Sequence, residues 1–272
     1  MDYDKINKII NKIGINKYVD DWNKITDINN LEEDIKKYHK HASIKIKENN
    51  IESKKLPKFL WDKNNKIGRI IYYEFILGND DKKNLLDEKK LIDITNKNLS
   101  DWFKNDIKGL IIDLRNHKGG NFLPFILSLK LILGSTTLFA WNKTKVAKND
   151  PFWFNFDNNL NLLDNQKFNS SELNFKKPIA IIIGNNTSSA GEFSASIFIG
   201  RKNVKFFGSR SAGFLSVNET IKINDDINLI IPTKYTTTVN NIFYDNEYID
   251  VDIETKQPIN TAKKWILKKV DF

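Results

Sequence analysis

Residues 177–199 read KPIAIIIGNNTSSAGEFSASIFI, and this stretch decides the fold class. Its run of isoleucines, residues 179–183, stops at Gly184 and is typical of a strand that is buried on both faces. A turn of small polar residues follows, and from about Ala190 apolar residues recur at helical spacing. The stretch therefore predicts a buried strand, a sharp polar turn and a helix.

The same order of elements occurs earlier in the chain. Residues 109–122, GLIIDLRNHKGGNF, predict a strand over 110–114 and a polar turn with two glycines, and a helix is expected over 125–132. Before them, residues 67–78 (IGRIIYYEFILG) predict another buried strand, followed by a helix over 83–104. Repeated strand, turn and helix units indicate an α/β fold, in which chemistry takes place at the carboxyl ends of the strands.

The ends of the chain frame this core. Isoleucines at helical spacing predict an N-terminal helical cap in residues 1–45, and the α/β core is expected over 46–256. Within the core, a further strand is expected at 204–207, with extended segments continuing through Tyr235. Residues 257–272 are expected to form a C-terminal helix.

Composition excludes several classes of function. The chain has 272 residues, of which 40% are hydrophobic, so it can bury a large core. The 43 basic and 34 acidic residues give a net charge of +9, but lysines and carboxylates are interleaved, and no nucleic-acid partner is expected. The absence of cysteine excludes disulfides and thiolate metal sites. No apolar run is long enough to span a membrane, so we expect a soluble protein, with the cytoplasm slightly favoured.

Two turns carry residues suited to catalysis. The serine-rich turn at 185–192 can be an ordinary helix cap or can present a serine hydroxyl beside backbone amides. Gly119 and Gly120 can form a simple tight turn or bring an amide close to a developing oxyanion. Histidine occurs only at His39, His41 and His117; no third ligand accompanies the first pair, so neither a metal nor a cofactor is predicted.

Several stretches, in the expected order, resemble the tail-specific or C-terminal processing serine peptidases. They are IGRIIYYEFI (67–76), GLIIDLRNHKGG (109–120), KPIAIIIGNNTSSAGEFSASIF (177–198), GSRSAGFLSVNE (208–219) and YIDVDIE (248–254). The resemblance implies a ClpP/crotonase-like α/β core. It also implies a serine protease, a hydrolase that cuts an extended peptide or protein tail.

The resemblance also implies the residues of the site. Alignment on Glu192 puts the nucleophile at Ser189, with Ser188 as the alternative. The expected oxyanion donors are the backbone amides of Ala190 and of Gly119 or Gly120.

The general base is where this chain departs from the processing peptidases. Their base is a lysine, and the aligned position here is Phe214. A second branch, which includes the tricorn protease core and the nisin resistance protein, uses an upstream histidine. The matching residue is His41, with His39 as the alternative, while Glu219 or Ser43 could orient the imidazole.

Other functions on this scaffold stay open at this point. His117 and Lys118 replace the small residues usual in the glycine turn, which leaves a catalytically inactive peptide-binding protein as the main alternative. Acyl-CoA chemistry uses a similar oxyanion hole, but the serine segment favours proteolysis. The expected partner is a peptide or protein tail, and no oligomeric state is indicated.

Overall fold

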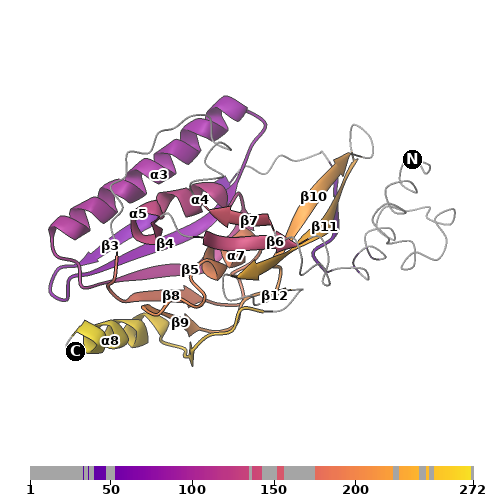
Figure 1. The fold of residues 1–272 in the computed structure, drawn as a ribbon. Coiled ribbons are helices and arrows are strands. Elements are labelled where there is room, and N and C mark those ends of the chain that lie inside the picture. Colours follow the sequence, from indigo (N-terminus) through magenta and orange to yellow (C-terminus); the bar gives the residue numbers. More distant parts are fainter. Residues whose placement is uncertain are drawn as a thin grey trace.

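A computed structural model describes residues 33, 36, 40–46, 53–134, 137–142, 152–155, 175–222, 227–238, 243–244 and 248–270. Most of the expected N-terminal helical cap (1–45), including His39, therefore lies outside the described residues. The remainder has the predicted α/β architecture, with helices on both faces of a mostly parallel sheet (Figure 1).

The central sheet is built from seven strands of the described residues, in the order β13-β9-β8-β5-β4-β2 with β3 also on β4. The strands β4, β5, β8, β9 and β13 pair in parallel, whereas β2 and β3 are antiparallel to β4. Their bounds are β2 (Ser53–Lys54), β3 (Lys58–Asp62), β4 (Ile67–Ile76), β5 (Gly109–Gly120), β8 (Ile179–Ile183), β9 (Val204–Gly208) and β13 (Ile253–Glu254).

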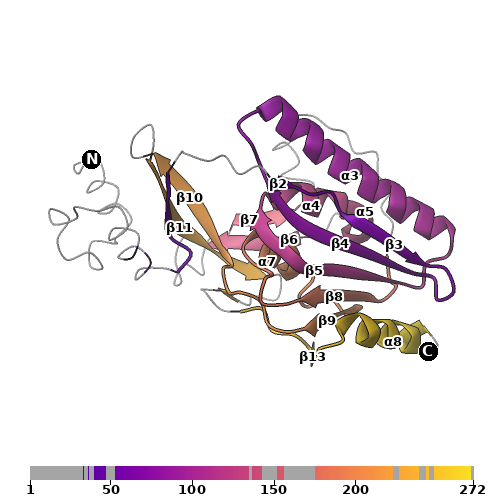
Figure 2. The same cartoon turned by 180° about the vertical axis from the view of Figure 1, so that it is seen from behind.

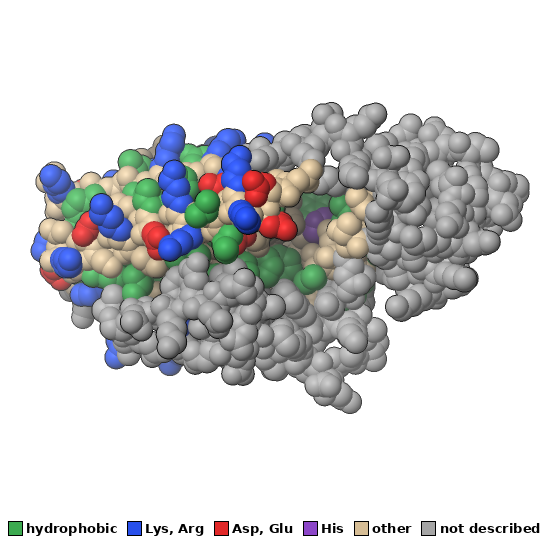
Figure 3. Space-filling view, turned by 90° about the horizontal axis from the view of Figure 1, so that it is seen from above, with side chains coloured by type: hydrophobic (Ala, Val, Ile, Leu, Met, Phe, Trp, Pro, Cys, Tyr) green, Lys and Arg blue, Asp and Glu red, His purple; other side chains and the backbone are tan. Residues whose placement is uncertain are grey.

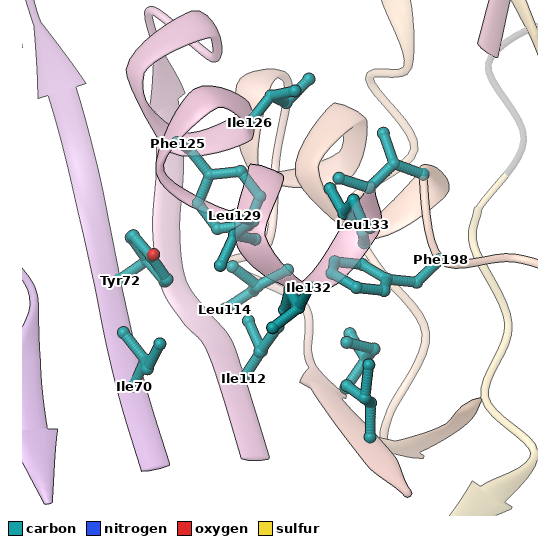
Figure 4. Close-up of a cluster of buried hydrophobic side chains, with 14 of the residues drawn as sticks. Ile70, Tyr72, Ile112, Leu114, Phe125, Ile126, Leu129, Ile132, Leu133 and Phe198 are labelled. Carbon is teal, nitrogen blue, oxygen red and sulfur yellow. The ribbon is translucent and has the colours of Figure 1, made fainter. Parts of the chain in front are cut away.

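Alternating residues of the parallel strands face two separate cores. Ile112 and Ile181 point into the larger core, where Tyr72 and Phe125 meet and Leu129 packs beside them (Figure 4). The neighbouring residues Ile111, Ala180 and Ile182 face Ala262 and Ile266 on the opposite side of the sheet. Burial on both faces explains why these strands are continuously apolar in sequence.

Helices cover both faces of the sheet. The larger core is covered by α3, α4 and α5, and the opposite face by α8 (Figures 1 and 2). The bounds are α3 (Asp81–Lys104), α4 (Leu123–Ser128), α5 (Lys130–Leu133), α7 (Ala190–Ser196) and α8 (Pro258–Val270). Where one helix is expected over 125–132, the structure has two, because the backbone of Leu129 (φ −99°, ψ 5°) leaves helical geometry. None of the helices among the described residues is long and apolar enough to cross a membrane.

A second, antiparallel sheet projects from one end of the central sheet (Figure 2). It contains β1 (Ser43–Ile46), β6 (Thr137–Asn142), β7 (Phe152–Asn155), β10 (Ser216–Lys222), β11 (Ile227–Thr238) and β12 (Phe243–Tyr244). Both β1 and β10 pair with β11, and their residues Ser43 and Thr220 both lie opposite Ile230. This sheet therefore joins the segment around residue 41 to the segment around residue 216, a contact between residues 175 positions apart.

Candidate active site

The serine-rich turn connects β8 to α7 at the carboxyl edge of the parallel sheet. Within it, the Thr187 hydroxyl donates to the Leu114 carbonyl oxygen at 3.0 Å and accepts from the Gly184 N–H at 3.0 Å. These bonds fasten the turn to β5. Ser189, the residue before α7, has φ 52° and ψ −116°, a strained backbone that non-glycine residues adopt rarely and often at functional sites.

Gly119 lies directly against Ser189. A Cβ atom added to Gly119 would be 3.3 Å from Ser189 Cβ and 3.7 Å from Ser189 Oγ, so the missing side chain leaves room beside the hydroxyl. The strand β5, expected to end at Leu114, continues to Gly120 and carries Gly119 to this place. Gly120 faces the other way, because a Cβ there would overlap the carbonyl group of Phe75 on β4.

The Glu192 side chain stabilises the serine-rich turn through hydrogen bonds. Its carboxylate is completely buried and accepts four hydrogen bonds. The donors are the backbone N–H groups of Ser189 (2.9 Å), Gly213 (2.6 Å) and Phe214 (2.7 Å) and the hydroxyl of Ser211 (2.6 Å). Burial raises the pKa of Glu192, while the four donors favour the ionised form. The carboxylate therefore fixes the serine-rich turn against the segment 211–214.

His41 lies beside this segment and is oriented by Ser216. The imidazole Nδ1 is 2.7 Å from the Ser216 hydroxyl oxygen. The ring also makes an edge contact with Phe214, with ring centres 5.3 Å apart. Burial, together with the positive charge of Lys40, lowers the pKa of His41 from 6.5 to about 4. Above this pH the imidazole is neutral.

Phe214 connects the histidine to the serine turn. Its ring contacts His41, and its backbone N–H donates to the same Glu192 carboxylate that binds the Ser189 N–H.

Figure 3 shows histidine surface at the bottom of a hollow on one face of the molecule. Of the two histidines that the structure describes, His41 is partly exposed and His117 is only 1% exposed.

The other candidate residues lie as follows. Ala190 is buried as the first residue of α7, and the Ser188 N–H donates to the His117 carbonyl oxygen at 3.2 Å. The backbone of Glu219 lies in β10, opposite Ile231, and its side chain is outside the description, as is the whole of His39.

Two features of the site were missed by the sequence analysis. Ser216 contacts His41 in the described structure, and nothing in its local sequence marks it as a partner of histidine. The sequence predicts only a structural role for Glu192, near the start of the helix where the dipole favours an anion, and does not indicate its contacts with residues 211–214. His117 is buried against Phe125 rather than placed at a substrate, which excludes direct contact between its ring and a ligand in the hollow.

The fold and the two turns define a class of protein, and comparison with known proteins identifies it. The family model "Peptidase family S41" matches residues 66–255, so the chain belongs to peptidase family S41. This confirms the resemblance, the α/β core and the predicted class, a serine-type peptidase. The match begins after His41, so it does not include the proposed histidine.

Three known proteins are similar to this chain. The nisin-resistance protein of Lactococcus lactis subsp. lactis is 35% identical over 176 residues, which is 63% of this chain. The chain covers 54% of that protein, or about half its length. A lipoprotein from Streptococcus agalactiae is 28% identical, with a TM-score of 0.74 over 89% of this chain and 81% of that one. The photosystem II D1 C-terminal processing protease shares the fold, with 12% identity and a TM-score of 0.52 over 76% of this chain and 47% of that one.

Proposed function

We propose that the protein is a serine endopeptidase that hydrolyses peptide bonds of an extended peptide or protein tail. Ser189 is the nucleophile, His41 is the general base, and the backbone amides of Gly119 and Ala190 stabilise the oxyanion. The observation that carries the proposal is the close approach of Gly119 to Ser189 Oγ, on a strained turn, at the carboxyl edge of the sheet. Gly120 is the weaker oxyanion candidate because it packs against Phe75.

The reaction begins with neutral His41. Its Nδ1–H donates to Ser216 Oγ, so that Nε2 carries the lone pair that accepts the proton of the Ser189 hydroxyl. Ser189 Oγ attacks the peptide carbonyl carbon, and the negative charge that develops on the carbonyl oxygen is stabilised by the two backbone amides. The imidazolium then returns the proton to the leaving amine, and the acyl-enzyme is hydrolysed by water activated by the same histidine.

The surroundings of His41 determine how this base performs. The low pKa of about 4 keeps the imidazole unprotonated at neutral pH, but also makes the imidazolium costly to form. Ser216 Oγ offsets part of this cost by accepting from Nδ1–H in both protonation states. An inactive peptide-binding protein is the second candidate, and the low basicity of His41 is the observation that favours it.

The alternative residues keep defined roles in this proposal. Ser188 would replace Ser189 if the strained turn only caps α7. His39 would replace His41, and Glu219 would assist the base, if substrate binding rearranged the histidine segment. A variant at each position tests these alternatives separately.

The compartment of the reaction is a further part of the proposal. Sequence alone slightly favours the cytoplasm, whereas a relative that is a lipoprotein points to a location outside the cytoplasmic membrane. We favour the second location because that relative aligns over most of this chain. Separation of cytoplasmic and membrane-associated fractions of the source cells, with detection of the intact protein, distinguishes the two.

Cleavage of degenerate peptide pools, followed by mass spectrometry, tests the proposed activity. New termini should appear with the wild-type protein and disappear with Ser189→Ala, while Ser188→Ala retains cleavage. Pools left uncut by a folded wild-type protein that still binds them would support the inactive peptide-binding protein instead.

A further inference from the structure

Two positively charged side chains lie around one exposed aromatic ring beside the candidate site. The Lys40 ammonium is 4.9 Å from the centre of the Tyr248 ring, and the Arg210 guanidinium carbon is 4.5 Å from the same centre. Tyr248 is 41% exposed, and Arg210 is exposed as well. We call these three residues the Tyr248 cluster.

Hydrogen bonds attach the Tyr248 cluster to the nucleophile turn. Lys40 donates to the Ala212 carbonyl oxygen at 3.3 Å, and the Ala212 N–H donates to the Thr187 carbonyl oxygen at 2.9 Å. The Lys40 ammonium also lies 4.8 Å from the centre of the Phe214 ring, which contacts His41. The cations therefore stand next to the proposed base and next to the turn that carries the proposed nucleophile.

The charges of this cluster are not neutralised within the part of the chain that the structure describes. Lys40 donates to a carbonyl oxygen and faces two rings, but neither Lys40 nor Arg210 forms an ion pair there. The nearby Glu192 carboxylate is buried, and both of its oxygens accept hydrogen bonds from other groups. A guanidinium and an ammonium that lie 4.5 Å and 4.9 Å from the centre of one exposed ring, and that have unused N–H donors, are suited to a carboxylate.

We propose that Lys40, Arg210 and Tyr248 form a subsite that binds a carboxylate of the peptide substrate within a few residues of the scissile bond. Arg210 and Lys40 donate hydrogen bonds to the two carboxylate oxygens, and the exposed ring of Tyr248 keeps the cations in place through its π face. This assignment rests on the proposed peptidase function, and it makes that enzyme selective for peptides with an acidic side chain or a free C-terminus.

The test uses octapeptide pools that lack acidic residues except at one position. Each pool carries Glu or Gln at that position and ends in an amide, and a further pair has Gln throughout with either a free or an amidated C-terminus. The ratio of kcat/KM for the Glu pool to that for the matched Gln pool should exceed about fivefold at one or two positions. A preference only for the free C-terminus would assign the carboxylate to the end of the chain instead of a side chain.

Variants locate the selectivity. Arg210→Gln and Lys40→Gln should each reduce the ratio toward one. The control Lys202→Gln removes an exposed cation from the turn after α7 and should leave the ratio as it is. The subsite is overturned if the wild-type protein prefers neither Glu over Gln at any position nor the free over the amidated C-terminus. It is also overturned if the observed preference is unchanged in Arg210→Gln.

Binding separates this proposal from the proposed activity. With Ser189→Ala, anisotropy of fluorescently labelled pools should show tighter binding of the preferred carboxylate pool, and the preference should weaken as salt is raised. Selective binding without cleavage by the wild-type protein would retain the subsite and reject the peptidase. Cleavage by the wild-type protein without selective binding would retain the peptidase and reject the subsite.

Discussion

The Oε2 atom of Glu192 lies 2.9 Å from the backbone nitrogen of Ser189 and accepts its N–H hydrogen bond. The same oxygen accepts from Phe214, whose ring contacts His41. One buried carboxylate therefore binds the backbone of Ser189, the proposed nucleophile, and the backbone of Phe214, whose ring packs against His41, the proposed base. The arrangement explains how a seven-residue helix, α7, can hold a strained residue at its start.

Replacing this carboxylate should disrupt both stability and reactivity. In Glu192→Gln, one oxygen becomes an NH₂ group that faces an N–H donor, so a buried polar group loses its partner. We expect a loss of about 2–3 kcal/mol in the free energy of unfolding, measured with urea, together with slower labelling by a fluorophosphonate. Glu254→Gln, at an exposed position, is the matched control. Full stability of Glu192→Gln would show that the charge is not needed.

Alanine variants of two glycines with positive φ distinguish an effect on the active site from an effect of backbone strain alone. Gly119 (φ 136°) and Gly134 (φ 65°) are both strained by alanine, but only at Gly119 would the new Cβ meet Ser189. Both alanine variants should lose about 1–3 kcal/mol of stability. Only Gly119→Ala should also lose about 10²–10³-fold in kcat. Equal activity of the two variants would remove Gly119 from the oxyanion site.

The pH dependence of the reaction reports the pKa of His41. Only the neutral imidazole accepts the serine proton, and burial lowers its pKa from 6.5 to about 4. The neutral form therefore persists to lower pH than it does for an ordinary histidine. We expect kcat/KM to rise with pH through about 4 and to be constant from about pH 5.5 to 7. A midpoint near 6.5 would mean that the histidine is solvated in the free enzyme.

Ser216 should act as a positioning residue for His41. Ser216→Ala removes the hydroxyl oxygen 2.7 Å from Nδ1, so the imidazole loses a hydrogen bond that orients it. We expect kcat to fall about tenfold to hundredfold, while the urea midpoint changes little. Ser209→Ala, which removes a hydroxyl that bonds Asn185, serves as the control. An unchanged kcat in Ser216→Ala would exclude this role.

His117 should make the fold sensitive to acid. Its ring is 1% exposed, and burial lowers its pKa from 6.5 to about 4, so the unfolded chain binds a proton more readily than the folded chain. The contribution to stability is complete above pH 6.5 and is lost as the pH falls to about 4, by about 3 kcal/mol. Urea unfolding of the wild-type protein and of His117→Gln at pH 7 and pH 4.5 measures it. An equal loss in both proteins would contradict the prediction.

Local sequence was sufficient to predict the parallel core and a polar turn between β8 and α7. The apolar runs around Ile112 and Ile181 have a direct physical meaning, because strands that are buried on both faces must be apolar throughout. The apolar runs end at the serine-rich turn between β8 and α7 and before the glycines at the end of β5, which marks both as turns. The resemblance supplies the expected roles of their residues. The family match confirms the α/β core and the serine peptidase class.

The surroundings of the histidine could not be predicted in the same way. Ser216 contacts His41, and the two meet because β1 and β10 pair with the same strand, β11. No local pattern indicates which strands of the second sheet become neighbours. The network around Glu192 likewise depends on the segment 211–214 folding back onto the turn, a tertiary contact that leaves no periodic signal.

Labelling of the native protein with a fluorophosphonate, followed by mass-spectrometric mapping of the modified residue, tests the central claim most directly. An activated serine reacts covalently with this probe, whereas an ordinary helix-capping serine does not. We expect modification at Ser189, no labelling of Ser189→Ala, strongly slowed labelling of His41→Ala and retained labelling of Ser188→Ala. An unlabelled wild-type protein with an intact circular dichroism spectrum, or a label on Ser188, would contradict the claim.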